Sequence, residues 1–268
     1  MEIPVLKDKD FHFFQKLIFE LAGLSMGDSK RPLISNRLAT RLRYYEINSY
    51  EEYSKILLDS KNQEERQIFI DLLTTNETSF FREPIHFEFM KSHILNVEPL
   101  SNPFRVWSAA CSSGEEPYSI AMLLEDKIKR GKWEIVASDI STRVLEKSKN
   151  GLYPIDKSEK IPVEYLKKYC LKGINSNSGY FKISDAIRRE IQFLSVNLNQ
   201  PFPKLGMFNV IFLRNVMIYF DKETRIKLIR NISSVLNHGG YLFIGHSETL
   251  LEITDQLVMV RPTIYRKK

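Results

Sequence analysis

Residues 105–122, "RVWSAACSSGEEPYSIAM", have the pattern of a buried strand, a short loop and a helix. Nucleotide cofactors often bind at such a turn, and a dinucleotide-binding loop needs several glycines because its backbone must approach a pyrophosphate closely. This loop has a single glycine, Gly114, and two acids, Glu115 and Glu116, follow it where the helix begins. Because these acids would repel a phosphate group, the sequence disfavours NAD and ATP as ligands.

A cofactor with a nucleoside and a cationic centre, but no phosphate, suits this loop better, and S-adenosylmethionine is such a cofactor. The next strand supports this interpretation, because it ends in "ASDIS". Asp139 in this segment comes about 25 residues after Gly114, close to the spacing at which an acid accepts hydrogen bonds from ribose hydroxyls in dinucleotide folds. The alternative is that Asp139 caps a helix that starts near Ser141.

A further group of polar residues follows a later strand, in "FLRNVMIYFD". Open α/β sheets bind ligands at the carboxyl ends of their strands, so we expect Asn215 and Tyr219 to hold a polar group of the substrate beside the cofactor. Arg214 lies in the same segment. Two other reactive side chains are predicted to be structural: His246 stands alone in "FIGHSE", and Cys111 has no histidine near it in sequence.

These residues depend on a series of short apolar segments that alternate with helical ones, from about residue 104 onward. Apolar character on both faces predicts a mainly parallel sheet covered on each side. The last two strands are too close in sequence for a helix between them, so we expect an antiparallel hairpin. The expected strands are 104–110, 133–140, 191–198, 208–215, 239–246, "LVMV" and "TIYRK". Between about 165 and 191, a Gly/Asn/Ser turn with strand-like flanks predicts a small antiparallel insertion.

The first part of the chain has a different pattern. From Asp10 to about Leu73, apolar residues recur at helical spacing, which predicts a small helical domain. It contains the basic stretch "KRPLISNRLATRLRYYEI", in which Arg37 and Arg41 share one face of a helix and Arg43 lies nearby.

Composition limits the class of protein. The 268 residues, 43% hydrophobic and 27% charged, are typical of a globular protein with a substantial core. Two cysteines far apart predict neither a disulfide framework nor a metal site. No apolar run is long enough to span a membrane, and we expect a cytoplasmic protein. A net charge of +6, with an isoelectric point near 9.1, suits either nucleic acid or an acidic protein partner.

Taken together, six segments resemble, in order, the signatures of the bacterial chemotaxis protein methyltransferases, the CheR family. They are "TTNETSFFRE", "RVWSAACSSGEEPYSIAM", "ASDIS", "VNL", "FLRNVMIYFD" and "GGYLFIGHSE". The resemblance implies a Rossmann-like S-adenosylmethionine-dependent methyltransferase domain with a small antiparallel β-subdomain insertion, preceded by an all-α domain. It implies domain bounds of 1–75, a connector at 76–90, and a catalytic domain at 91–268 with the insertion at about 165–191.

The resemblance also implies an activity: methyl transfer from S-adenosylmethionine to glutamate carboxylates on the cytoplasmic helices of membrane chemoreceptors, giving methyl esters and S-adenosylhomocysteine. Whether the insertion also binds a receptor C-terminal peptide stays open, because only some family members do so. Arg82 and Tyr219 would flank the transferred methyl group. The cofactor would contact Asn76, Thr78, Arg82, Glu116, Asp139, Asn197, Leu198, Arg214 and Asn215.

Two other functions are compatible with parts of the sequence. The basic charge and the Arg37/Arg41 face suit a nucleic-acid methyltransferase, but the sequence has no motif typical of base flipping. A module that binds S-adenosylmethionine or a receptor without turnover is the non-enzymatic alternative. Methylatable receptor helices are acidic, so we expect Arg37, Arg41 and Arg43 to dock the receptor, with no nucleic-acid partner and no membrane insertion. The alternative is that these arginines form a charged surface that contacts only solvent.

Overall fold

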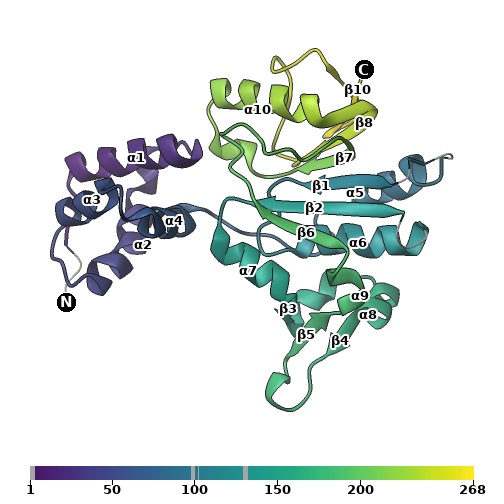
Figure 1. Ribbon diagram of the computed structural model, residues 1–268, viewed down its shortest axis with the longest axis horizontal. Coiled ribbons are helices and arrows are strands. Elements are labelled where there is room, and N and C mark those ends of the chain that lie inside the picture. The colour runs from purple at the N-terminus through teal and green to yellow at the C-terminus, as the bar shows by residue number, and fades with distance from the viewer. Residues whose placement is uncertain (1–3, 98–99, 102, 129–131) are drawn as a thin grey trace.

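A computed structural model describes residues 4–97, 100–101, 103–128 and 132–268. Residues 1–3, at the start of the predicted helical domain, lie outside the described ranges. The helical domain forms the left part of Figure 1. Its first helix ends at Gly23, which adopts a φ of 73° that favours glycine and allows the chain to turn. The elements of this domain are α1 (Asp8–Ala22), η1 (Asp28–Lys30), α2 (Arg31–Tyr44), α3 (Tyr50–Leu58) and α4 (Gln63–Leu73).

A seven-stranded sheet forms the centre of the molecule, in the order β6-β2-β1-β7-β8-β10-β9. The five strands from β6 to β8 pair in parallel, and β10 pairs antiparallel with β8 and β9, so the predicted parallel sheet and closing hairpin are confirmed. The strands are β1 (Phe104–Ser108), β2 (Trp133–Asp139), β6 (Ile191–Ser195), β7 (Phe208–Leu213), β8 (Leu236–Ile244), β9 (Leu257–Arg261) and β10 (Ile264–Lys267).

Both faces of the sheet are covered, because successive residues of a strand point to opposite faces. On β1 and β7, Trp107 and Ile211 join one hydrophobic cluster with Leu228 of α10, whereas Val106 and Val210 join a second cluster with residues of α5 and α6. The helices of this domain are α5 (Pro84–Phe89), the π-helix η2 (Met90–Ile94), α6 (Glu115–Lys127), α7 (Thr142–Asn150), η5 (Met217–Tyr219) and α10 (Lys222–Val235).

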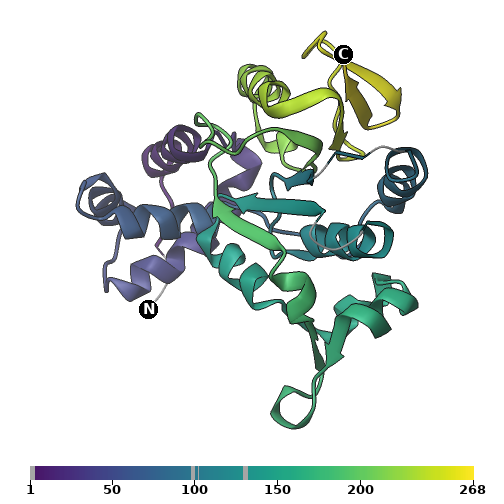
Figure 2. The same ribbon diagram turned by 45° about the vertical axis from the view of Figure 1, so that its right-hand side comes forward.

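A separate three-stranded antiparallel sheet confirms the predicted insertion, and it projects away from the main sheet in Figures 1 and 2. One of its strands, β3 (Leu152–Pro154), lies ahead of the predicted range of 165–191. It pairs with β5 across the 25 residues from 155 to 179, so no local turn signal marks it as part of this sheet. The remaining elements are η3 (Ile155–Lys160), α8 (Val163–Tyr169), β4 (Cys170–Lys172), η4 (Asn175–Asn177), β5 (Tyr180–Ile183) and α9 (Asp185–Arg188).

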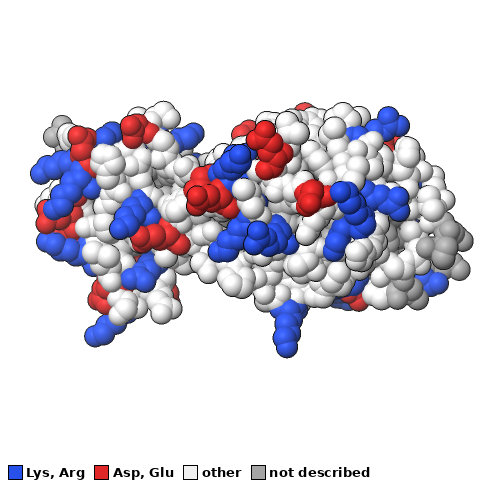
Figure 3. Space-filling view, turned by 90° about the horizontal axis from the view of Figure 1, so that it is seen from above, with Lys and Arg blue, Asp and Glu red and all other residues white. Residues whose placement is uncertain are grey.

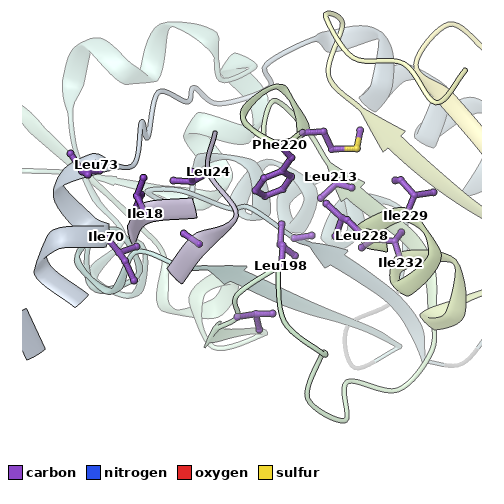
Figure 4. Packing of buried hydrophobic residues seen from close by; sticks show 14 of the residues in the cluster. Ile18, Leu24, Ile70, Leu73, Leu198, Leu213, Phe220, Leu228, Ile229 and Ile232 are labelled. Carbon is purple, nitrogen blue, oxygen red and sulfur yellow. The ribbon is translucent and has the colours of Figure 1, made fainter. Parts of the chain in front are cut away.

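The helical domain packs against the carboxyl edge of the main sheet. Figure 4 shows Ile18, Leu24, Ile70 and Leu73 of the helical domain in one cluster with Leu198, Leu213 and Phe220 of the catalytic domain. Polar contacts add to this packing: the Asp71 carboxylate of α4 accepts hydrogen bonds from the backbone N–H groups of Thr142 and Arg143, at 3.1 and 3.3 Å. These N–H groups begin α7, so a side chain of one domain caps a helix of the other.

Within the described ranges, no helix combines the length and the apolar character needed to cross a membrane.

Candidate active site

A cavity lies between the helical domain and the carboxyl ends of β1, β2, β6 and β7. The strand order reverses between β1 and β7, and open α/β sheets bind ligands at such a point. The cavity lining includes every residue for which a cofactor or catalytic role was expected: Asn76, Thr78, Arg82, Glu116, Asp139, Asn197, Leu198, Arg214, Asn215 and Tyr219. The structure thus brings together residues that are spread over more than half of the sequence.

Gly114, the glycine of the β1–α6 loop, allows close packing inside the protein. Gly114 has a φ of 95°, and a Cβ atom there would lie 2.9 Å from the Ser148 side chain of α7 and from the Tyr153 hydroxyl. A larger residue would therefore strain the backbone and push α7 away from the loop. The single glycine therefore lets α7 approach the loop, a packing role that involves no phosphate group.

The two neighbouring acids of this loop have different surroundings. Glu115 points away from the cavity, is fully buried and forms an ion pair with Lys157 of η3. Glu116 lines the cavity, where its carboxylate accepts hydrogen bonds from the Ser108 hydroxyl at 2.7 Å and from Arg214 at 3.2 Å. Burial raises the pKa of Glu116, and the positive charge of Arg214 opposes this shift. Only Glu116 can reach a ligand.

Asp139 ends β2 with both carboxylate oxygens bonded to the backbone. It accepts hydrogen bonds from Ser112 N and Ser141 N, each at 2.9 Å. Asp139 therefore also contacts the start of the following helix, as its alternative role as a helix cap predicts, because Ser141 is the N-cap residue of α7. Each oxygen keeps a further acceptor site for a ligand. Burial raises the pKa of Asp139, and the two backbone hydrogen bonds oppose the shift.

Arg214 links three parts of the site. Its side chain is 2% exposed and lies 3.1 Å from the Glu83 carboxylate and 3.2 Å from that of Glu116. It also donates a hydrogen bond to the carbonyl oxygen of Arg82. Arg214 therefore fixes the connector against the sheet, a role that the sequence did not indicate.

The connector is bent sharply around Arg82. The residues on either side of it, Phe81 and Glu83, have φ values of 47° and 57°, which are uncommon for residues with a side chain. The Ser119 hydroxyl accepts a hydrogen bond from Phe81 N at 2.9 Å and so holds this bend on α6. The Arg82 guanidinium reaches back to the Glu77 carbonyl oxygen at 2.9 Å, while its side chain lines the cavity. Such strained conformations persist where the surrounding contacts impose them, and functional sites often contain them.

The loop after β7 is held by a buried carboxylate, Glu248. Its oxygens accept hydrogen bonds from Asn215 N, Met217 N and Gly245 N at 2.6–2.9 Å. Asn215 has a φ of 58°, and its side chain fills the space beside Gly245 where a Cβ atom would lie. Tyr219 is tied to the helical domain, because Ser25 N donates a hydrogen bond to its carbonyl oxygen at 2.8 Å. Among the described residues, the Tyr219 hydroxyl has no hydrogen-bond partner, although Tyr219 interacts electrostatically with Arg37.

Residues of the helical domain complete the cavity, although no motif in the sequence marked them. Ser25, Met26, Lys30 and Leu33 lie in the lining. Asn197 connects the two domains here, because its side-chain amide donates a hydrogen bond to the Leu21 carbonyl oxygen at 2.7 Å. The helical domain thus closes one side of the cavity and limits the access of water to it.

The basic cluster of α2 lies outside the cavity, and two of its members have internal partners. Arg37 donates hydrogen bonds to the carbonyl oxygens of Leu72 and Thr74, both at 2.8 Å. Arg41 forms a two-point ion pair with Glu65 of α4, at 2.8 and 2.6 Å. Arg43 is exposed. Arg37 and Arg41 therefore hold α2 against α4 and the residue that follows it.

The two residues that were expected to be structural differ in their surroundings. Cys111 is 1% exposed, and burial raises the pKa of its thiol well above the usual value, which disfavours the nucleophilic thiolate. His246 lies outside the cavity lining, beside Glu83 and His86, with 3.8 Å between its Nε2 and Glu83 Oε2.

The donor set of the cavity fits S-adenosylmethionine. Two carboxylates, the partly exposed Glu116 and the buried Asp139, offer acceptors for an ammonium group and for ribose hydroxyls, and the loop before Glu116 offers no phosphate cradle. Apolar side chains such as Leu198 give a nucleobase a surface to pack on. The arrangement suits a cationic nucleoside ligand.

Comparisons with known proteins point the same way. Residues 9–74 match the family model "CheR methyltransferase, all-alpha domain", and residues 76–266 match "CheR methyltransferase, SAM binding domain". The chain is 38% identical to a chemotaxis protein methyltransferase of Salmonella typhimurium, with 97% of this chain and 90% of the relative covered. It is 37% identical to that of Escherichia coli (97% and 91% covered) and 36% identical to chemotaxis protein methyltransferase 2 of Pseudomonas aeruginosa (98% and 96% covered).

Proposed function

The chain belongs to the CheR family of chemotaxis protein methyltransferases, and on this premise we propose that it methylates glutamate side chains of chemoreceptors. Its cofactor is S-adenosylmethionine, which the name of the matched catalytic domain specifies. The products would be a glutamate methyl ester and S-adenosylhomocysteine. One observation carries the proposal: Arg82 and Tyr219 line the same cavity as the carboxylates Glu116 and Asp139.

We assign the cofactor-binding residues from this lining. Glu116 would accept a hydrogen bond from the ammonium group, and Asp139 would accept hydrogen bonds from the ribose. Asn197 and Leu198 lie beside the helical domain, where they would contact the nucleoside. The other proposed contacts are Asn76 and Thr78 of the connector and Arg214 and Asn215 after β7.

The proposed chemistry needs no general base. A glutamate carboxylate has a reference pKa of about 4.3, so the nucleophile is already ionised at neutral pH. When bound, the cofactor would supply a methyl group on a sulfonium centre, and this group would pass to the carboxylate oxygen as the carbon–sulfur bond breaks and the neutral thioether leaves. Arg82 would hold the incoming carboxylate by charge, and the free hydroxyl of Tyr219 would orient it. Catalysis would rest on alignment in a cavity that two domains enclose.

The partner would be the acidic cytoplasmic helices of chemoreceptors, which places the reaction in the cytoplasm. Arg43 is exposed on the helical domain and is the member of the α2 cluster whose charge is available for docking. The face in Figure 3 shows basic side chains mixed with acidic ones over both domains. This mixture favours an acidic protein segment of limited size over the continuous phosphate backbone of a nucleic acid.

The test is transfer of a labelled methyl group from S-adenosylmethionine to receptor-containing membranes. We expect label in the receptor band, and we expect mild base to release it as methanol, because methyl esters hydrolyse under conditions that leave N-methyl groups intact. Arg82→Ala should abolish transfer. The matched control is Arg266→Ala, because Arg266 is exposed on β10, far along the sheet from the cavity.

Other outcomes would contradict the proposal in distinguishable ways. Base-stable label would mean that another group is methylated. Label in added RNA or DNA, with none in receptor, would favour the nucleic-acid methyltransferase. Tight cofactor binding without transfer to any acceptor would favour a binding module.

A further inference from the structure

Behind Arg214, outside the cavity lining, Glu83, His86 and His246 form a compact cluster. One ligand atom of each residue lies within 4.8 Å of those of the other two. Glu83 directly precedes α5, His86 lies within α5, and His246 follows β8. The fold therefore brings two imidazoles and a carboxylate together from distant parts of the chain.

On the far side of its ring, His86 contacts a hydroxyl that can accept a hydrogen bond from a proton-bearing nitrogen. Thr263 Oγ1 lies 2.6 Å from the Pro262 carbonyl oxygen, to which it can donate, and 2.8 Å from His86 Nε2, from which it can then accept. His86 Nδ1 then carries a lone pair, and it lies 3.4 Å from Glu83 Oε2.

Two buried acceptors thus face each other with no hydrogen bond between them. Neither Glu83 Oε2 nor His86 Nδ1 has a hydrogen-bond partner, and the His86 side chain is fully buried. Arg214 approaches Glu83 Oε2 to 3.1 Å, but it has a second carboxylate, Glu116, as a partner. Because Arg214 is shared with Glu116, the Glu83 carboxylate does not have this guanidinium to itself, and its Oε2 atom stays without a hydrogen-bond partner.

We propose that Glu83, His86 and His246 form a binding site for a divalent transition-metal ion, with its remaining coordination position open to solvent. Two imidazole nitrogens and one carboxylate oxygen are ligands that Zn²⁺, Ni²⁺ and Cu²⁺ favour. With metal–ligand bonds of about 2.0–2.1 Å, tetrahedral ligands lie roughly 3.3 Å apart. The observed separations from Glu83 Oε2 are 3.4 Å to His86 Nδ1 and 3.8 Å to His246 Nε2, and all three ligand atoms lie within 4.8 Å of one another, so the exposed His246 would move inward to complete the site.

Thr263 would hold the metal ligand in place. By accepting the hydrogen bond of His86 Nε2, it fixes the ring so that Nδ1 points to the ion. His246 would be the movable ligand, because its side chain is 55% exposed. The ion would enter from the solvent on that side.

The test is calorimetric titration of the untagged full-length protein with Zn²⁺, supported by the visible absorption of Co²⁺ in the same site. We expect one equivalent to bind to the parent protein. His246→Ala should weaken binding at least tenfold without affecting the fold, because this residue is exposed. His238→Ala is the matched control: this histidine is also exposed, and its ring contacts the Lys268 carbonyl oxygen.

Thr263→Val provides a second test, because it keeps the shape of the side chain and removes the acceptor of His86. We expect the affinity to fall about 10- to 100-fold, as for other residues that support a metal ligand. Equal Zn²⁺ affinity of the parent and His246→Ala, or no Co²⁺ band in the parent, would overturn the proposal. No cofactor or receptor is present in these titrations, so their outcome is independent of the proposed methyl transfer.

Discussion

Replacing Arg41 should reveal how much this residue of the basic α2 cluster contributes to the stability of the helical domain. Arg41 is 14% exposed and pairs with Glu65, which is 3% exposed. The hydroxyls of Tyr53 and Tyr45 donate to the same carboxylate at 2.6 and 3.0 Å. Arg41→Met would keep the aliphatic stem of the side chain beside Tyr44 and remove the charge. Glu65 would then be a buried carboxylate with two neutral donors only.

The magnitude follows from this burial. Removing one partner of a buried ion pair costs about 3–5 kcal/mol, because the other charge stays desolvated. Arg41 is partly accessible to water and the tyrosines keep their hydrogen bonds, so the lower end of this range applies. We expect the free energy of unfolding of the helical domain to fall by about 3 kcal/mol.

The assay is urea unfolding followed by two signals. Both tryptophans, Trp107 and Trp133, lie in the catalytic domain, so their fluorescence reports on that domain, whereas far-ultraviolet circular dichroism also reports on the helical one. Arg43→Met is the control, with an expected change within about 0.5 kcal/mol, because Arg43 is exposed. If Arg41→Met destabilises the protein no more than Arg43→Met does, the argument from the buried pair is refuted.

Three further predictions concern the cavity and the contact between the domains. Asp139→Ala should weaken S-adenosylmethionine binding about 10- to 150-fold in calorimetry, because the ribose loses a hydrogen bond to a charged acceptor. Near-ultraviolet circular dichroism checks that the variant is folded, and an unchanged affinity would remove Asp139 from the site. Tyr219→Phe should lower turnover at saturating substrates and leave the dissociation constant of the cofactor unchanged, and equal turnover would exclude a role for the hydroxyl in orienting the substrate. Asp71→Ala should reduce stability by about 0.5–2 kcal/mol in urea unfolding, because α7 loses its cap from the other domain, and an unchanged midpoint would contradict this role.

The sequence by itself determined the elements of the catalytic domain and much of the cavity. Strands that are apolar on both faces must be buried on both faces, so the segments at 104–110 and 133–140 could be recognised without a structure. The ends of parallel strands meet at one edge, which placed Asp139 and Asn215 together. The family resemblance added the connector residues, including Arg82, which spacing alone did not reveal.

Only the tertiary structure decided which partner each charged side chain has. Glu115 and Glu116 are neighbours in sequence, yet one pairs with Lys157 and the other faces the cavity, because the first turn of a helix points adjacent side chains in different directions.

The same holds for contacts between distant segments. The sequence around Arg41 does not show that this residue pairs with Glu65 of α4. It also does not show that β3 belongs to a sheet whose other strands follow α8. His246 stood alone in the sequence, and it meets Glu83 only where β8 ends beside α5. Local periodicity fixes helices and strands, whereas the partners of buried charges depend on how those elements pack, which no local pattern encodes.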